Sequence, residues 1–565
     1  MFVLRVYLLL KICKIYAISV YQQSIFSVYY KSNGLIITVL LLKLTLRMRM
    51  KIERINSFNR RFVLKVCLHT CTKSPDFERS MGITMDILKD LKPQKVFYYF
   101  EQICRIPHGS GNIDRLSDYL AAFAKERKLV CIQDELKNVI IIKEAAPGYE
   151  KEAPIILQGH MDMVAVKKPG ASIDMEKQGL ELKVDGDYVY AENTSLGGDD
   201  GIAVAYALAI LDDETLQHPK LEIIITVDEE VGMDGARGID VSMLEGKRML
   251  NLDSEEEGIL WAGCAGGARV DWSVPVTWEM KSGSICEVSI KGLSGGHSGA
   301  EIDKERGNAN CLLGRLMEEL QDMEGFSIAQ LAGGLADNAI PRESSAAVIV
   351  DSGKETELMA AIKRVEAELK QELQTKDPGV FIEASDLVKG SIRCLTEESV
   401  KKVSYLLFTA PNGVQAMSAD IQGLVETSLN MGVMELKENA FEAHFSVRSS
   451  LESAKRVLIR RLKRLVETAG GAQGVQGDYP GWTYQVHSPF RDMAAQVYRE
   501  IFKTEPEVRA IHAGLECGLL SAKIPGLECI SIGPNMKDIH TTEERLSISS
   551  TERMWNYVLE ILKQK

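Results

Sequence analysis

The sequence predicts an α/β protein, in which a domain built on a mostly parallel sheet receives a second, α+β domain as an insertion. Three observations predict this architecture. Between residues 85 and 265, continuous Ile/Val/Leu runs alternate with helical segments, which is typical of strands covered on both faces. From about Gly266, apolar and polar residues alternate instead, as in half-exposed strands. The first pattern returns near residue 490.

The first part of the α/β domain is expected over residues 85–265. Apolar residues at helical spacing predict helices over residues 87–106, 113–127 and 199–211. Short β-branched and apolar runs predict strands over residues 138–143, 153–158, 221–227 and 248–252. In such open sheets, ligands bind beyond the carboxyl ends of the strands.

The inserted domain is expected over residues 266–480, and the α/β domain is expected to resume over residues 481–565. Predicted strands of the insertion are 269–276, 284–291, 346–351, 380–384, 426–436 and 440–448. Its predicted helices are 307–322, 355–374 and 451–468, and a turn-rich stretch, 470–481, is expected at its exit. The last part is predicted to contain a helix over 491–502, a strand over 527–532 and a helix over 550–562.

The composition is that of a globular protein, with 45% hydrophobic and 26% charged residues among 565. It excludes collagen, coiled coils, disordered tails and multi-span membrane proteins. The net charge is −12, but residues 1–80 contain fourteen basic and three acidic residues. They carry +11, which leaves −23 on the remaining 485 residues. A protein this acidic is not expected to bind nucleic acid.

Residues 1–80 form a basic extension of doubtful authenticity. They contain a single Gly and a single Ala, and no apolar run reaches the length that spans a bilayer. The first interpretation is non-coding sequence upstream of a true initiator, at Met81 or Met85. A basic membrane-surface anchor and a targeting segment are the two alternatives. The eight cysteines of the remaining chain are scattered without a CxxC pair, which favours free thiols and a cytoplasmic protein.

Histidine and acidic residues follow several predicted strands. His160 and Asp162 lie two apart in GHMD, so they share a face of an extended strand, where an acid can orient a metal-binding histidine. Asp199 lies in GGDDG at a predicted helix start, where helix capping is the alternative explanation. Glu229 and Glu230 follow the Ile-rich strand and point in different directions, so one can bind metal while the other faces metal-bound water. A solvated charge run is the alternative for this pair.

Two more segments complete this pattern, Asp253 in NLDS and His540 in DIHTTEE, each after a predicted strand. Histidines and carboxylates without thiolates suit Zn²⁺, Mn²⁺ or Co²⁺. Two such ions bridged by one carboxylate form a centre used for hydrolysis. The residues therefore predict a metallohydrolase.

From about Met85 to the C-terminus, the order of motifs resembles that of the di-zinc peptidases related to aminoacylases and glutamate carboxypeptidases. Within that clan, the motifs most resemble those of the dipeptidases that act on Xaa-His peptides. The motifs are GHMD, GGDDG, VDEEVG, NLDSEE, GGHSG, NAIPRE, GDYPGW, GLECG and IGPNMKDIHTTEE. The resemblance implies that His160 and Asp253 bind one zinc ion, that Glu230 and His540 bind the other, and that Asp199 bridges both.

The resemblance also implies roles in catalysis and substrate binding. Asp162 would hold the ring of His160, and Glu229 would be the general base. The inserted domain would serve as a lid and in dimerisation. His297 would reach into the neighbouring subunit of a homodimer and stabilise the oxyanion, and Arg448 would bind the substrate's terminal carboxylate. Asn338 is a weaker candidate for substrate contact.

Each of the three substrate-binding candidates has a plain structural alternative: a loop histidine without a role for His297, a surface salt bridge for Arg448 and a turn residue for Asn338. Glu516, in GLECG, is expected either to meet the substrate's amino end or to be structural.

The activity implied by the resemblance is metal-dependent hydrolysis of dipeptides, including Xaa-His peptides such as β-alanyl-histidine. Two divalent ions are expected, Zn²⁺ first and Co²⁺ or Mn²⁺ as alternatives. An N-acyl-amino-acid deacylase or a tripeptidase is the alternative within the clan. A non-catalytic binding or scaffolding protein, tethered to a membrane by residues 1–80, is the alternative from another class, although no membrane association is expected.

Overall fold

The computed structural model describes residues 86–565, which form one compact unit by themselves. The basic extension, residues 1–80, lies outside the described residues, so its three interpretations stay open. Between residues 86 and 565, no helix combines the length and the apolar character needed to cross a bilayer.

One of the two large sheets has eight strands, and both pieces of the predicted α/β domain contribute to it. In spatial order the strands are β1 (Val130–Gln133), β2 (Val139–Lys143), β6 (Leu221–Thr226), β3 (Ile155–His160), β7 (Arg248–Asn251), β22 (Glu528–Ser531), β8 (Ile259–Cys264) and β21 (Glu507–Ile511). The four strands β6, β3, β7 and β22 run parallel to one another, as does the pair β8 and β21. Antiparallel pairs join β1 to β2, β2 to β6 and β22 to β8.

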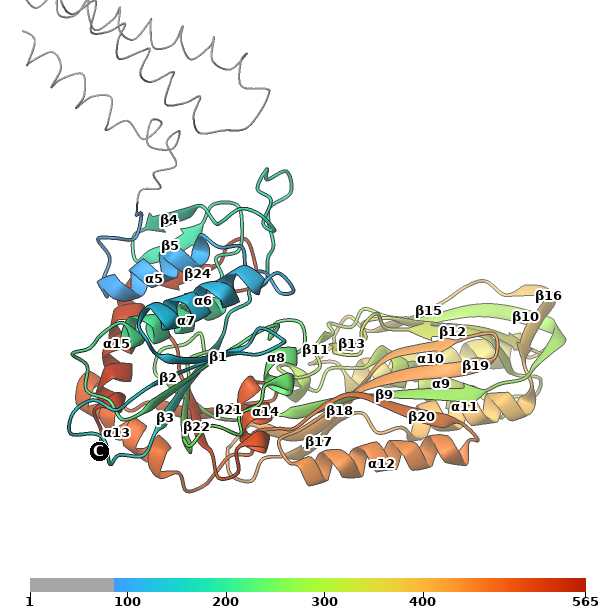
Figure 1. Cartoon of the computed structure of the whole chain (residues 1–565). Helices are drawn as coiled ribbons and strands as arrows, with labels where there is room; N and C mark the ends of the chain where they lie inside the picture. Colours follow the sequence, from blue (N-terminus) through green and yellow to red (C-terminus); the bar gives the residue numbers. More distant parts are fainter. Residues whose placement is uncertain (1–85) are drawn as a thin grey trace, which may run out of the picture. The chain divides into compact units, whose positions relative to one another are not determined.

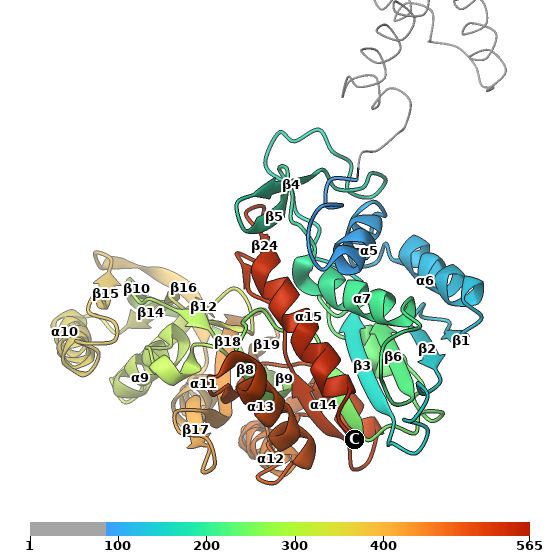
Figure 2. The ribbon, with the colours of Figure 1, turned by 90° about the vertical axis from the view of Figure 1, so that its left-hand side faces the viewer.

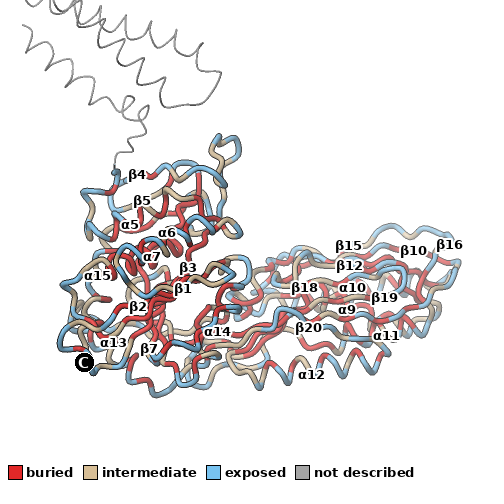
Figure 3. Tube along the Cα trace, viewed as in Figure 1, coloured by how far each residue is buried: buried red, intermediate tan, exposed pale blue. Residues whose placement is uncertain are grey.

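Helices cover both faces of this sheet (Figures 1 and 2). On one face lie α5 (Gln94–Cys104), α6 (Asp114–Glu126), α7 (Gly198–Leu211), α13 (Pro489–Phe502) and α15 (Ile548–Leu562). The other face packs on α14 (Glu516–Lys523) and the segment after the short helix α8 (Asp234–Gly238). Within β3, Ile155 and Leu157 join the first core while Ile156 joins the second. Double coverage explains why these strands read as unbroken apolar runs and appear buried in Figure 3.

The second large sheet is antiparallel and is built by residues between Gly266 and Tyr479. In spatial order its path is β15 (Phe381–Ala384), β10 (Trp278–Lys291), β14 (Ser344–Val350), β12 (Ser327–Gly333), β18 (Val425–Leu436), β19 (Ala440–Ser449), β9 (Gly266–Pro275) and β20 (Ala472–Tyr479). Off this path, β16 (Val388–Leu395) pairs with β10, and β17 (Gly413–Met417) pairs with β18.

A single apolar core joins this sheet to four helices (Figure 1). They are α9 (Ala309–Leu320), α10 (Glu355–Glu372), α11 (Glu397–Thr409) and α12 (Glu452–Thr468). The predicted fold class, an α/β domain with an α+β insertion, is confirmed. The domain boundaries at residues 85, 265 and 480 stay a prediction.

Two small sheets accompany the two large ones. The first pairs β11 (Gly296–His297) with β13 (Ala339–Ile340). The second has the order β23 (Met536–Lys537), β24 (Arg545–Ser547), β5 (Tyr188–Ala191) and β4 (Leu182–Asp185). A 3-10 turn, η1, covers Ile302–Lys304.

The structure differs from the predicted elements in several places. The stretch 470–481 contains β20, which pairs with β9 at the edge of the sheet despite its Gly-rich, polar sequence. Backbone pairing needs no apolar side chains at an exposed edge, so the composition is misleading there. The first helix begins at Gln94, well inside the predicted range 87–106, and α11 is not among the predicted elements.

Candidate metal centre and active site

Four of the predicted site residues lie at one edge of the eight-stranded sheet. His160 is the last residue of β3, Glu229 and Glu230 follow β6, and Asp253 follows β7. Since β6, β3 and β7 are parallel neighbours, their carboxyl ends meet at this edge. The topology therefore brings together side chains that are far apart in the sequence.

Asp199 and His540 reach the same edge from outside the sheet. Asp199 lies in the first turn of α7, a helix whose residues are all buried. His540 lies in the loop between β23 and β24, with a positive φ of 61°. The side chain of His540 is 43% exposed, whereas that of His160 is 1% exposed, so the site is open on the His540 side.

Asp199 contacts both histidines, each through a different oxygen. Its Oδ1 lies 3.2 Å from Nε2 of His160, and its Oδ2 lies 3.0 Å from Nε2 of His540. Each histidine has a second acidic neighbour. Nε2 of His160 is 3.5 Å from Oδ1 of Asp253, and Nε2 of His540 is 2.9 Å from Oε1 of Glu230. Oε1 of Glu230 is buried and makes no well-aligned hydrogen bond despite this distance.

These residues form two groups that could each hold a metal ion, and the groups share Asp199. One is His160, Asp199 and Asp253, and the other is Asp199, Glu230 and His540. Within each group the donor atoms lie within 4.8 Å of one another. All donors are imidazole nitrogens or carboxylate oxygens, a set that suits Zn²⁺, Mn²⁺ or Co²⁺. The residues therefore fit two divalent ions bridged by one carboxylate.

The electrostatics of the cluster favour positive charge at this position. Asp199 and Glu230 raise the pKa of His540 to about 10. Burial alone would lower the pKa of His160, but Asp253, Asp162 and Asp199 raise it well above its usual range. Since the carboxylates stabilise protons on both rings, they can equally stabilise cations that replace those protons.

Asp162 connects the metal donors to Glu229. Its Oδ1 lies 3.5 Å from Nδ1 of His160, and the same ring nitrogen is 3.0 Å from the Asp162 carbonyl oxygen. The carboxylate also accepts from the backbone N–H of Glu229 at 3.0 Å and from the hydroxyl of Ser110 at 2.8 Å. This arrangement orients the ring of His160 and fixes the backbone at Glu229.

The side chain of Glu229 has the properties of a general base. Burial, together with the charges of Glu230 and Asp199, raises its pKa to about 7, although His160 opposes the shift. A carboxylate with a pKa near neutrality can both accept and return a proton at physiological pH. Glu230 contacts His540, whereas the described residues contain no hydrogen bond or ion pair to the Glu229 side chain. The division of roles between the two residues stays a prediction.

His297 lies in β11, paired with Ala339 of β13. Its Nδ1 accepts from the amides of Gly299 and Ala300 at 3.2 and 3.0 Å, so the neutral ring carries its proton on Nε2. Burial and the charge of Arg448 lower the pKa of His297, which favours that neutral form.

Arg448 lies in β19 and is 9% exposed. Within residues 86–565 it forms no ion pair, and its Nε has no hydrogen-bond partner. One weak hydrogen bond joins its Nη1 to the hydroxyl of Tyr479 at 3.4 Å. A surface salt bridge therefore does not hold Arg448, and its guanidinium remains suited to binding an anion.

Two further candidates for substrate contact behave differently. Asn338 is exposed, and its carbonyl accepts from the amide of Ser298 at 2.9 Å. Glu516 is fully buried, and its Oε2 accepts from Gln158 and Thr226, each at 2.5 Å. Burial, followed by the charge of Glu229, raises the pKa of Glu516 to about 8. These contacts favour the structural alternative for Glu516.

The predicted residues thus fall into two groups. His160, Asp162, Asp199, Glu229, Glu230, Asp253 and His540 gather at the sheet edge, while His297, Asn338 and Arg448 lie in the segment 266–480. No hydrogen bond or ion pair within residues 86–565 joins the two groups directly.

Sequence reasoning missed His512, which lies after β21 and contacts Ser428, the residue paired with Arg448 between β18 and β19. Its Nε2 lies 2.7 Å from the hydroxyl of Ser428, and its Nδ1 is buried without a partner. Burial and the charge of Arg448 lower its pKa to about 3, so His512 is neutral. No local motif marks it, because its partners come from a different part of the chain.

Comparison with known proteins agrees with this geometry. The profile of peptidase family M20/M25/M40 matches residues 156–564. The chain therefore belongs to this family, and it is a metallopeptidase.

Two similar proteins were found over nearly their whole lengths. The cytosol non-specific dipeptidase of Escherichia coli K12 is 36% identical over 482 residues, which are 85% of this chain and 99% of that protein. The crystal structure of aminoacylhistidine dipeptidase from Vibrio alginolyticus matches with a TM-score of 0.80 and 33% identity. That match covers 86% of this chain and 99% of the other.

Proposed function

We propose that this protein hydrolyses dipeptides, including Xaa-His peptides such as β-alanyl-histidine, with two divalent ions, preferably Zn²⁺. The observation that carries the proposal is Asp199, whose two oxygens lie 3.2 and 3.0 Å from the histidines of two separate donor groups. His160 and Asp253 would hold one ion, Glu230 and His540 the other, and Asp199 both. The names of the two similar proteins support the dipeptide substrate.

When bound, the two ions would polarise the scissile carbonyl and lower the pKa of water. Glu229 accepts a proton from the attacking water and returns it to the leaving amine. Its raised pKa, about 7, supports both transfers. Asp162 keeps Glu229 and His160 in place through the contacts described above.

Arg448 binds the terminal carboxylate of the dipeptide. This role is supported by the burial of the Arg448 guanidinium, which has no acidic partner in residues 86–565. His297 donates from Nε2 to the oxyanion that develops on the substrate in the active site of the neighbouring subunit. The active form of the enzyme is therefore a homodimer. Asn338, next to β13, is a secondary candidate for substrate contact.

The protein is proposed to act in the cytoplasm. Its eight cysteines in the described residues are all free, which is typical of a reducing compartment. The acidic charge of residues 81–565 argues against a nucleic-acid partner.

The proposal is tested with protein reconstituted with Zn²⁺ or Co²⁺ and assayed on β-alanyl-histidine, a tripeptide and an N-acetyl amino acid. Preferential hydrolysis of the dipeptide is expected. Faster cleavage of the N-acetyl amino acid or of the tripeptide would instead identify a deacylase or a tripeptidase. No turnover of any substrate, with both metals bound, would overturn the enzymatic proposal.

A further inference from the structure

One buried carboxylate joins the start of α7, which carries Asp199, to the loop that carries His540. Glu544 follows His540 by four residues and is 3% exposed. Both of its oxygens accept hydrogen bonds from backbone amides of the loop that leads into α7. The donors are Leu196 (2.7 Å) and Gly197 (3.1 Å) to Oε2, and Gly198 (2.8 Å) and Asp199 (3.4 Å) to Oε1.

The sequence before α7 explains why these four amides converge. Amides at a helix start have no partner within the helix. Gly197 adopts the left-handed conformation, with φ at 67°, and a Cβ there would lie 2.8 Å from the sulfur of Met163. Successive amides in such a turn point toward one centre and bind an anionic group. Here the carboxylate of Glu544 occupies that centre.

These contacts tie the bridging carboxylate to an otherwise exposed ligand. The loop of His540 is open to solvent, and both Asp538 and His540 have positive φ values. The carboxylate of Glu544 attaches this loop directly to the amide of Asp199. Its position therefore determines where His540 lies relative to Asp199.

We propose that Glu544 is a positioning residue of the metal centre, which holds His540 and Asp199 at the separation that the second ion requires. This proposal rests on the metal site proposed above. Glu544 belongs to neither donor group, so it acts through the two segments that it joins. Mutation of a residue that hydrogen-bonds to a metal ligand typically changes the metal affinity by about 10- to 100-fold.

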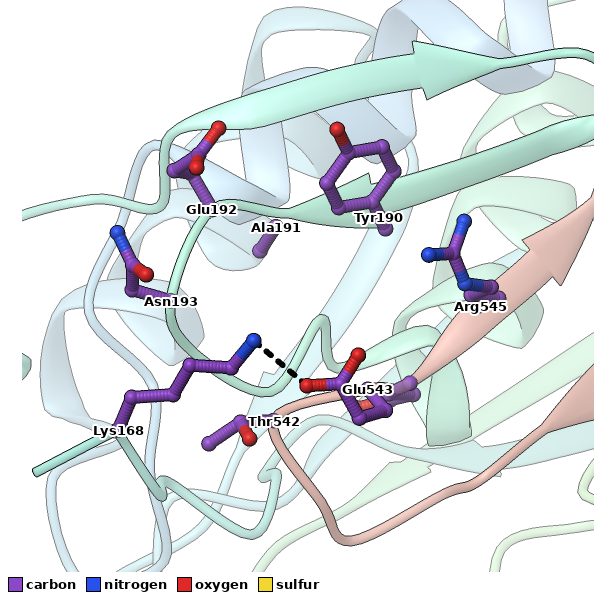
Figure 4. A pocket seen from close by; sticks show the side chains of 9 residues that line it. Lys168, Tyr190, Ala191, Glu192, Asn193, Thr542, Glu543 and Arg545 are labelled. Atoms are coloured by element: carbon purple, nitrogen blue, oxygen red, sulfur yellow. Dashed lines mark ion pairs between the residues drawn. The ribbon is translucent and has the colours of Figure 1, made fainter.

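The neighbouring glutamate provides a matched control. Glu543 is exposed, and its carboxylate pairs with Lys168 at 2.6 Å. Figure 4 shows this pair across a small polar pocket of about 110 Å³, which Tyr190 and Arg545 also line. The pocket contains none of the proposed metal ligands. Glu544 also lines this pocket, but none of its four amide donors donates to Glu543, so Glu543→Gln is expected to leave those four hydrogen bonds in place.

The test compares Glu544→Gln with Glu543→Gln by titrating each metal-free protein with Co²⁺ and following its visible absorption. The NH₂ group of glutamine cannot accept, so Glu544→Gln loses two of the four hydrogen bonds. We expect the second Co²⁺ equivalent to bind about 10- to 100-fold more weakly, with an altered absorption band. Glu543→Gln should match the wild type. At saturating Co²⁺, the kcat of Glu544→Gln should return toward that of the wild type.

A second pair of variants covers the case in which Glu544→Gln fails to fold. A Cβ at Gly198 would lie 3.3 Å from Oε1 of Glu544 and 3.1 Å from the sulfur of Met536. A Cβ at Gly201, in the same helix, would lie 3.3 Å from the ring of Phe100 instead. Gly198→Ala should therefore weaken the second Co²⁺ site, whereas Gly201→Ala should not.

Wild-type Co²⁺ isotherms and spectra in folded Glu544→Gln, or equal isotherms in the two alanine variants, would overturn the positioning role. Failure of the wild-type protein to bind two Co²⁺ equivalents would instead overturn the metal centre itself. The two failures are thus distinguishable.

Discussion

Asp162 accepts the backbone N–H of Glu229 at 3.0 Å, and the same carboxylate oxygen lies 3.5 Å from Nδ1 of His160. One side chain thus contacts both a proposed metal ligand and the backbone of the proposed base. Because Asp162 is fully buried, its position is set by the fold rather than by solvent. In the proposed mechanism, the base is therefore held relative to the proposed metal donors before substrate arrives, which lowers the cost of reaching a reactive geometry.

Glu229→Gln and Glu229→Ala are expected to retain both metal ions but to lose about 10²- to 10⁴-fold in kcat, because the general base is absent. Metal content by mass spectrometry and steady-state kinetics check this expectation. In the wild type, activity should fall as the pH drops through the pKa of Glu229, because the protonated carboxyl cannot act as a base. Without metal this pKa is about 7, and bound metal ions lower it. A wild-type kcat in either variant would exclude Glu229 as the base.

Glu516→Gln is expected to remain active, since a buried neutral acid and an amide are close in shape. The pKa of Glu516 is raised to about 8, so the folded protein keeps its proton while the unfolded chain ionises near pH 4.5. The contribution of Glu516 to the free energy of unfolding of the wild type therefore falls as the pH rises from about 4.5 to 8. Thermal unfolding of both proteins across that range should show a growing advantage for Glu516→Gln.

The control for Glu516 is Glu222, another fully buried glutamate. Its carboxylate accepts from the amides of Glu245 and Gly246 at 3.0 and 2.9 Å. Glu222→Gln should lose stability across the whole pH range. A large rise in KM for dipeptides in Glu516→Gln would instead assign Glu516 to the substrate's amino end.

Arg448→Met is expected to raise KM for dipeptides by roughly 10- to 100-fold, the cost of losing a charged hydrogen bond to the substrate carboxylate. Its unfolding temperature should not fall, because the folded protein loses a buried charge that has no acidic partner in the described residues. The control is Arg491→Met. Arg491 is similarly buried but donates to the carbonyls of Gln485 and Val486, so its variant should be less stable. An unchanged KM in Arg448→Met would remove Arg448 from the substrate site.

His297→Ala and Glu229→Ala are each expected to be inactive alone, yet active when mixed. If His297 serves the neighbouring subunit, a mixed dimer contains one site with an intact base and an intact histidine. Random reassortment of equal amounts should then restore about a quarter of the wild-type activity. Measuring activity after subunit exchange checks this, and no recovery in verified mixed dimers would argue against a shared site.

The strand ends were predictable because short apolar runs followed by His or acidic residues have a clear local pattern. Parallel neighbours then place those residues together, as happens for His160 and Asp253. The sequence pattern placed Asp199 and His540 in one set of candidate metal residues, but their pairing across 341 residues came only from the family resemblance.

Residues whose contacts lie in remote parts of the chain escaped prediction. Glu544 accepts from four amides of a remote loop, and nothing in its own neighbourhood reveals those donors. His512 likewise depends on Ser428 in another sheet. Strand β20 was missed because an edge strand is held by backbone pairing, which leaves little trace in the composition.

The separation between Asp199 and His540 has a consequence during protein synthesis. A ribosome adding about 5 to 20 residues per second needs roughly 20 to 70 seconds to pass from one to the other. During that interval the growing chain comes to hold His160, Asp199 and Asp253 but neither His540 nor the carboxylate of Glu544. One donor group can therefore form on the nascent chain, and the second is completed only near the end of translation.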